Sequence, residues 1–161
     1  TRSAPAPEPA RPRPAITAEG EAAVVGAGNT AGRLVARLFG LPGEASRVPV
    51  RVLIESRDGR EHWTRFFDGK PMRSVMQRAG DGVIEERFGA LAIRMTLVPR
   101  PDGLDMVRRS GRLGPIRLPK FMLPSIKAEE RVEGNRRHRF DVEIGLPLIG
   151  RIVAYRGYLE L

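Results

Sequence analysis

Cysteine is absent from this chain of 161 residues, and histidine occurs only twice. The absence of cysteine excludes disulfides, zinc sites built on thiolates and cysteine nucleophiles, and it fits a cytoplasmic protein. His62 and His138 have no serine or second histidine at a useful spacing, so neither a hydrolytic triad nor a metal site is predicted. We therefore expect a protein that is not an enzyme and uses no cofactor.

Long apolar runs and aromatic residues are also scarce. No run approaches the ~20 residues that a helical membrane span needs, and no segment combines a basic start with an apolar core like a secretion signal. Aromatic residues make up 6% of the chain. No aromatic-glycine run resembles a base-stacking surface, so nucleic-acid binding is not favoured.

Positive charge is in excess, with a net charge of +9 that is carried mostly by arginine. Such an excess is typical of proteins with an anionic partner, such as a lipid headgroup or an acidic ligand. The arginines are dispersed rather than clustered, which favours the alternative that they form the solvated faces of strands. A binder of anionic surfaces or lipid headgroups therefore stays as a second hypothesis.

The first fifteen residues are rich in proline and alanine. Such a segment cannot pair in a sheet and buries little apolar surface. The composition therefore predicts that residues 1–15 form a disordered, extended linker. Residues 16–161 are numerous enough for a single domain with its own core. A linker at the front of the chain indicates another domain upstream.

From Val48 onward the sequence has the two-residue period of half-buried β-strands. Asp-Gly pairs that predict tight hairpin turns follow at 58–59, 68–69, 81–82 and 102–103. Residues 111–124 predict a proline-interrupted loop that can hold one turn of helix. The pattern predicts a mainly β fold, an antiparallel meander of about nine strands. So many strands in a short chain must curl, and we expect a barrel or half-barrel.

One short amphipathic helix is predicted near the N-terminus, over residues 33–40. Its shared apolar face consists of Leu34, Val35, Leu38 and Phe39. We expect this helix to cap or plug one opening of the barrel.

The segment from Gly26 to Gly32 resembles the glycine-rich turn of a dinucleotide-binding domain. Gly26, Gly28 and Ala31 match the required spacing, and Glu55 follows at the end of a strand, where an acid would bind ribose. One hypothesis is therefore a nucleotide-binding oxidoreductase fragment that uses this motif.

The connection after Glu55 decides between that hypothesis and a simpler one. A nucleotide fold requires a helix there and parallel strands joined by long crossovers. The Asp58-Gly59 pair predicts a hairpin instead. We therefore favour a bend between a first strand and the helix, with Asn29 or Thr30 as the helix N-cap.

A candidate ligand site surrounds Trp63. Pairing across the turns at 58–59 and 68–69 puts Arg65 on the same face as Trp63, because directly opposed residues point the same way. A buried arginine needs a carboxylate or a bound anion. The possible internal carboxylates are Glu85, Glu86 and Asp141. A purely structural ion pair is the commoner outcome, and a bound polar or anionic ligand is the alternative.

The same pairing collects further side chains on this face. Methionine gives a soft, adaptable lining, although filling a core is its ordinary role. The predicted ligand-binding residues are Trp63, Arg65, Met72, Ser74, Met76 and Met95.

Five strings of the sequence, in this order and spacing, resemble a bacterial domain of unknown function, family 4166. These strings are residues 34–42, 61–67, 86–89, 140–142 and 155–159. The family is often found C-terminal to a Rossmann-type module similar to saccharopine dehydrogenase. The resemblance covers residues 20–161 and implies a β-rich domain attached to another module. It supplies no catalytic residues.

Together these features predict an accessory module that binds a hydrophobic or amphipathic ligand or docks against a partner domain. Barrels of this size can enclose a small ligand. An open cavity lined by Trp63, Arg65 and the methionines would favour ligand binding, whereas a filled interior would favour docking.

Overall fold

The computed structural model describes residues 15–134 and 136–161. The linker predicted for residues 1–15 lies outside the described residues, except for Ala15. The elements are β1 (Ile16–Val25), α1 (Thr30–Leu38), β2 (Ala45–Arg57), β3 (Arg60–Phe67), β4 (Lys70–Gly80), β5 (Val83–Phe88), β6 (Leu91–Arg100), β7 (Gly103–Leu113), β8 (Ile116–Arg117), the 3₁₀ turn η1 (Lys120–Met122), β9 (Ser125–Glu133), β10 (Arg137–Leu146) and β11 (Gly150–Glu160).

The strands form one closed antiparallel barrel. Strands β1 to β6 pair in chain order, β6 pairs with β7, and β7, β9, β10 and β11 continue the sheet back to β1. Ten strands close the barrel, and β8 lies outside it as a short addition to β7. The predicted antiparallel barrel with one helix is confirmed, with more strands than the nine expected.

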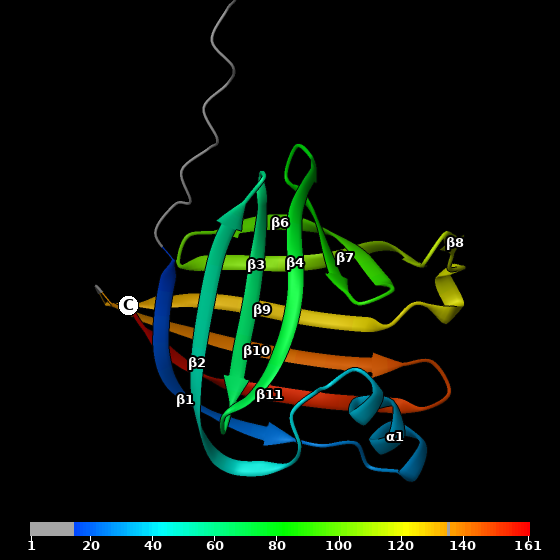
Figure 1. The fold of residues 1–161 in the computed structure, drawn as a ribbon, viewed down its shortest axis with the longest axis horizontal. Helices are drawn as coiled ribbons and strands as arrows, with labels where there is room; N and C mark the ends of the chain where they lie inside the picture. The colour runs from blue at the N-terminus through cyan, green and yellow to red at the C-terminus, as the bar shows by residue number, and fades with distance from the viewer. Residues whose placement is uncertain (1–14, 135) are drawn as a thin grey trace, which may run out of the picture.

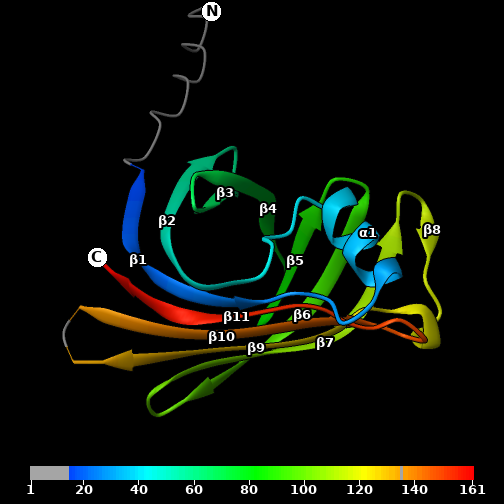
Figure 2. The same ribbon diagram turned by 90° about the horizontal axis from the view of Figure 1, so that it is seen from below.

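The barrel is flattened into two walls that cross (Figure 1). Strands β2, β3 and β4 run across the front, and β9, β10 and β11 run behind them in a different direction. Figure 2 separates the walls and places α1 at one end of the barrel, the same end as β8 and the β10–β11 turn. The helix therefore stands at one opening, where it was expected.

The hairpin turns fix the register of the front wall. Asp58 and Gly59 both have positive φ, at 51° and 73°, as a two-residue turn with left-handed central residues requires. Ile54 consequently pairs with Trp63 and Val52 with Arg65, as predicted. This register puts Trp63 and Arg65 on the inner face of β3.

The region predicted as a loop over 111–124 is partly strand. Strand β7 continues to Leu113, because Gly111 pairs with Ile93 and Arg112 with Ala92. Gly111 permits this extension, since a Cβ atom there would lie 2.7 Å from the Leu123 side chain. The expected helical turn is the 3₁₀ segment η1.

Only half of the predicted apolar face of the helix turns inward: Val35 and Phe39 border the interior of the barrel, whereas Leu34 and Leu38 do not. Asn29 is its N-cap and accepts a hydrogen bond from the Gly32 amide at 2.7 Å. Gly32 is the buried residue of α1, and Leu34 and Leu38 are exposed. The helix approaches β11 through Gly32, so the leucines on its other side point outward. A glycine carries no apolar side chain, and the apolar pattern therefore gave no sign of this contact face.

Strands β1 and β11 lie so close together at Gly157 that a side chain there would collide with the β1 backbone. This predicts that Gly157 is required for stability. A Cβ atom at Gly157 would lie 2.0 Å from the Glu21 carbonyl oxygen. We expect Gly157→Ala to lower the free energy of unfolding by about 2 kcal/mol or more, because backbone cannot yield as a flexible side chain can. The matched control is Gly43→Ala, where a Cβ would meet nothing within 4 Å. Equal urea midpoints for the two variants would contradict this account of the β1–β11 seam.

Candidate functional site: the interior of the barrel

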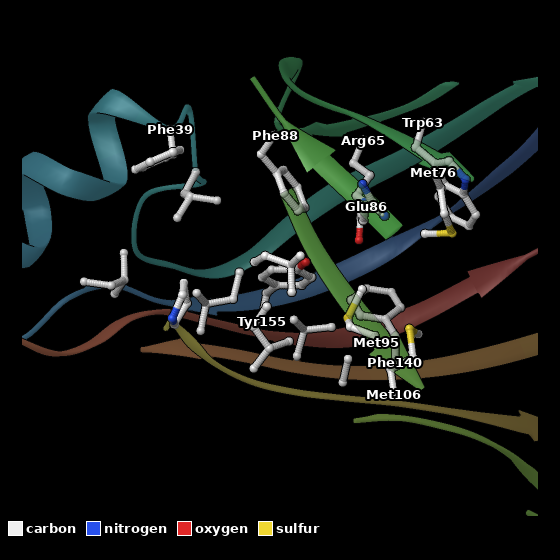
Figure 3. A pocket seen from close by; sticks show the side chains of 18 of the residues that line it. Phe39, Trp63, Arg65, Met76, Glu86, Phe88, Met95, Met106, Phe140 and Tyr155 are labelled. Atoms are coloured by element: carbon white, nitrogen blue, oxygen red, sulfur yellow. Dashed lines mark hydrogen bonds and ion pairs between the residues drawn. The ribbon is translucent and has the colours of Figure 1, made fainter. Parts of the chain in front are cut away.

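A cavity of about 160 Å³ lies inside the barrel. Side chains from both walls line it, and Val35, Phe39 and Leu41 from α1 and the segment after it line one end. Figure 3 shows Phe39 at that end and Trp63 with Met76 at the other. Only three of the described residues that line the cavity are charged, namely Arg65, Glu86 and Glu130. The interior is therefore an apolar space with one small polar region in its wall.

Aromatic rings and methionines form much of the lining. Tyr155 of β11 contacts Phe67 and Phe140 edge to face, with ring centroids 5.1 Å and 6.1 Å apart. Met76, Met95 and Met106 come from three different strands, β4, β6 and β7. Aromatic rings and flexible thioethers give such a surface large apolar area that can adapt to an occupant.

The polar region of the wall is built on Arg65. Its guanidinium donates to Ser74 Oγ at 2.8 Å and to Glu86 Oε1 at 3.0 Å, and Ser74 Oγ donates to the same Glu86 oxygen at 2.6 Å. The guanidinium also lies 4.8 Å from the centre of the Trp63 ring. Glu86 is the partner that Arg65 was expected to need, and the charges of the two cancel.

Tyr155 brings a hydroxyl group to the same region. Burial raises the pKa of Tyr155 to about 12, while Arg65 lowers this pKa and Glu86 raises it further. The phenol is therefore neutral at physiological pH. A neutral phenol can both donate and accept a hydrogen bond inside an apolar cavity.

Four of the six predicted ligand residues line this cavity. They are Trp63, Arg65, Met76 and Met95. Met72 faces inward on β4 and packs in the core cluster with Val50 and Phe67, but it does not border the cavity. Ser74 is buried and acts on the cavity through its bonds to Arg65 and Glu86.

The prediction omitted Phe140, Met106 and Tyr155 as ligand residues. Alternation along β7, β10 and β11 points all three inward, and the sequence contains that signal. It does not contain the pairing of β7 with β9, which brings Met106 opposite Ala128 in the back wall.

The side chain of the neighbouring residue Glu85 lies on the opposite, outer face of β5. Its side chain accepts hydrogen bonds from Arg87, Arg94 and Arg112 on the outside of the barrel, at 2.9 to 3.2 Å. Burial by itself raises the pKa of Glu85, but the three arginine hydrogen bonds outweigh burial and hold the pKa below its ordinary value. This carboxylate therefore anchors the outer wall and takes no part in the cavity.

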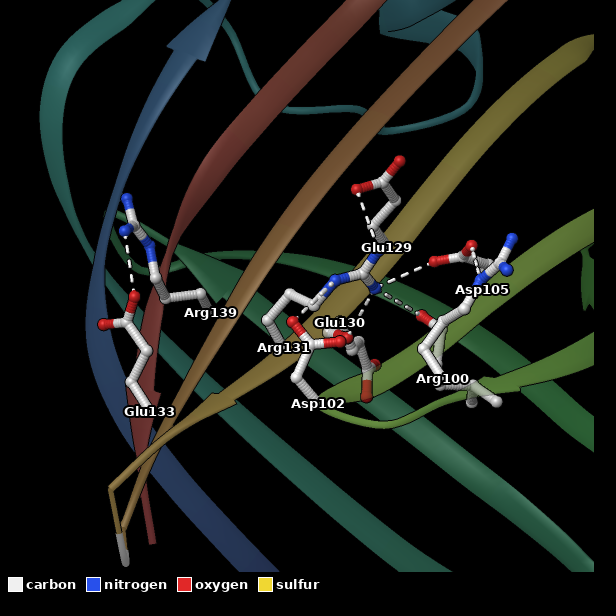
Figure 4. A network of polar contacts seen from close by, with 9 residues as sticks. Arg100, Asp102, Asp105, Glu129, Glu130, Arg131, Glu133 and Arg139 are labelled. Atoms are coloured by element: carbon white, nitrogen blue, oxygen red, sulfur yellow. Dashed lines mark hydrogen bonds and ion pairs between the residues drawn. The ribbon is translucent and has the colours of Figure 1, made fainter.

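Ion pairs also use the arginines of the outer back wall (Figure 4). Arg131 of β9 donates to Asp105 of β7 at 2.8 Å, and Asp105 accepts a second bond from Arg100 at 2.7 Å. The hydrogen bonds from Arg100 and Arg131 lower the pKa of Asp105. Part of the dispersed positive charge is thus paired with carboxylates on the outer faces of strands. This agrees with the prediction that the arginines form solvated strand faces.

The sequence matches one family model, described as Domain of unknown function (DUF4166), over residues 10–159. The chain belongs to this family. The match confirms the resemblance seen in the sequence. No curated protein and no solved structure matches the chain. The description of the family names no reaction and no ligand.

Within this member of the family, the glycine-rich segment does not belong to a nucleotide fold. Strand β1 pairs antiparallel with both β2 and β11, and β2 turns at Asp58-Gly59 into β3 without a helix. The parallel β-α-β unit that a dinucleotide site requires is therefore not formed by the described residues, and the oxidoreductase alternative is wrong. Gly32 instead allows the segment before the helix to fold closely on the first turn of α1, since a Cβ at Gly32 would lie 2.7 Å from the Ala27 Cβ and 3.1 Å from Asn29 Oδ1.

Across residues 15–134 and 136–161, no group of three or more His, Asp or Glu side chains could hold a metal ion. No helix in the same part of the chain has both the length and the apolar character needed to cross a membrane.

The buried phenol of Tyr155 gives a pH test of the site. Folding raises its pKa from 10.0 to about 12, so the unfolded chain loses this proton first as pH rises. The stability that the neutral phenol contributes is complete below pH 10 and falls by about 2 kcal/mol by pH 12. We expect the wild-type protein to lose more stability than Tyr155→Phe over this interval, as measured by urea unfolding. Parallel losses in the two proteins would show that Tyr155 ionises as readily in the fold as outside it.

Proposed function

We propose that this domain is a binding module, and not an enzyme, that holds a small hydrophobic or amphipathic molecule inside the barrel. The observation that carries the proposal is the unfilled cavity of about 160 Å³ with its almost wholly apolar lining. An enclosed apolar cavity of about 150 Å³ already binds benzene; this cavity is partly open to solvent, so a longer molecule can extend from it. An empty space of this kind costs stability in a protein that serves only as a scaffold.

The position of Trp63 supports a direct assay. It is the single tryptophan of the chain and lines the cavity. We expect the neutral apolar dye N-phenyl-1-naphthylamine to quench its fluorescence saturably, because a dye in the cavity lies within range of energy transfer. Ala128→Phe adds a ring to the cavity wall and should weaken dye binding at least about tenfold.

The matched control for that variant is Val107→Phe. Val107 is exposed on the outer face of β7, next to the inward-facing Met106. Thermal unfolding of both variants checks that they are folded. Equal dye affinity in the folded Ala128→Phe and Val107→Phe proteins would contradict binding in the cavity.

A second candidate function is docking of the cavity mouth on an anionic lipid surface. Helix α1, strand β8 and the β10–β11 turn lie at the same end of the barrel (Figures 1 and 2), and these segments carry several exposed apolar side chains. This apolar rim consists of Leu34, Leu38, Phe39, Ile116, Phe121, Met122 and Leu148. Leu38 and Phe121 are 75% and 74% exposed.

Basic residues lie among the side chains of the apolar rim. They are Arg33, Arg37, Lys120 and Arg151, all exposed. Apolar side chains that enter a bilayer, surrounded by cations that meet anionic headgroups, are the combination that interfacial membrane proteins use. The same rim would also suit a partner domain, such as the upstream Rossmann-type module that the family resemblance implies.

A vesicle-binding assay distinguishes docking of the apolar rim on a lipid surface from docking on a partner domain. We expect the protein to sediment with vesicles of phosphatidylglycerol and phosphatidylcholine but not with phosphatidylcholine alone, and to release at high salt. The double variant Leu38→Ser/Phe121→Ser should bind about tenfold more weakly, while Val107→Ser on the outer wall should bind like the wild type. A protein that ignores anionic vesicles at low salt would exclude lipid docking and leave the rim to a partner domain.

A further inference from the structure

The charge balance of the cavity narrows the class of ligand, on the premise that the cavity binds a ligand as proposed above. Arg65 is the one cation among the described lining residues, and it is already paired with Glu86. Glu130 adds a second carboxylate to the lining. A ligand carboxylate would therefore find no unpaired cation and would meet two negative groups. Burying an unpaired charge in an apolar space is costly, so the cavity disfavours anionic ligands such as fatty acids.

The unused hydrogen-bonding atoms of the polar region point to a neutral group. Among the described residues, both side-chain hydrogen bonds to Glu86 end on Oε1. No side-chain nitrogen or oxygen of the described residues is both fully buried and without a partner, so the second carboxylate oxygen, Oε2, is open to the cavity. It can accept one hydrogen bond, and the neutral Tyr155 hydroxyl can donate one.

We infer that the ligand is a neutral apolar molecule that carries a hydroxyl group, with the hydroxyl placed at the Arg65–Glu86–Tyr155 region. Its O–H donates to Glu86 Oε2, and its oxygen accepts from Tyr155 or Arg65. Its hydrocarbon part lies against the methionines and aromatic rings of the two walls. The Arg65–Glu86 pair stays intact and neutral when this ligand binds, so no charge is left without a partner.

Three ligands with the same eight-carbon chain test this inference in the wild-type protein. They are 1-octanol, octanoate and octylammonium, each titrated against bound N-phenyl-1-naphthylamine at pH 7.5. We expect octanol to displace the dye at concentrations at least about tenfold lower than either charged ligand, since the Arg65–Glu86 pair is already balanced and offers neither ion a free counter-ion. Tight binding of octylammonium through Glu130 would count against the inference. Octanoate or octylammonium binding as tightly as octanol would overturn the inference and leave cavity binding itself intact. Failure of the dye to bind would overturn the proposed function instead.

Glu86→Gln changes the charge of the site without changing its shape. It removes the carboxylate that balances Arg65, so a ligand carboxylate can take that place. We expect octanoate affinity to rise about tenfold, because one like charge is lost and one arginine is freed. The control is Glu129→Gln, which makes the same change in net charge at an exposed position on the outer face of β9.

Tyr155→Phe tests the hydroxyl contact independently of the ion pair. The variant keeps the ring that packs on Phe67 and Phe140 and loses only the phenol oxygen. We expect octanol binding to weaken about threefold to tenfold with the loss of one hydrogen bond, when octanol affinity is calculated with the dye affinity measured in the same variant. Unchanged octanol affinity in Tyr155→Phe, together with unchanged octanoate affinity in Glu86→Gln, would place the ligand's polar group elsewhere.

Discussion

Closure of the antiparallel sheet is the constraint on which the rest of the structure depends. The pairings of β6 with β7 and of β1 with β11 convert a meander into a barrel of ten strands, so β8 is the one strand of the described chain left outside it. Alternate residues of each strand then face inward, whatever their chemistry. Eight strands already enclose a space that side chains can just fill, and the diameter grows with strand number. A ten-stranded barrel with an inner surface of ordinary side chains therefore keeps an open space, and that space is the cavity.

Consecutive side chains of β5 point to opposite faces of the sheet, so the two buried glutamates Glu85 and Glu86 lie on opposite sides of the barrel wall. Glu86 faces inward and meets one arginine, so the polar region of the interior is neutral. Glu85 faces outward and meets three arginines, so the outer surface there stays positive. Two adjacent glutamates thus support two environments: an apolar interior suited to a neutral ligand and a basic exterior suited to anionic surroundings. The apolar rim lies where these two environments meet, at the opening beside α1.

Local patterns in the sequence were sufficient to predict the front wall. Asp-Gly turns set the register that places Trp63, Arg65 and Ser74 together, and the need of a buried arginine for a carboxylate reduced its partner to three candidates, one of which is Glu86. Contacts between distant segments were not predictable in the same way. The pairing of β7 with β9 brings Met106 opposite Ala128 in the cavity wall, and Met72, although it faces inward, packs in the core cluster and does not border the cavity. Helix α1 turns Val35 and Phe39 inward but leaves Leu34 and Leu38 exposed, and its buried residue Gly32 leaves no mark in an apolar pattern.

The occupancy of the cavity can be measured most directly through the five methionines of the chain. Met76, Met95 and Met106 line the cavity, Met72 packs in the core cluster, and Met122 is exposed on η1. In a protein labelled with ¹³C at the methionine methyl groups, titration with 1-octanol should shift the signals of the three lining residues and produce nuclear Overhauser effects from them to the alkyl chain. The Met122 signal should not move. Shifts confined to Met122, or no shifts at any methionine up to the solubility limit of the alcohol, would contradict a ligand site inside the barrel.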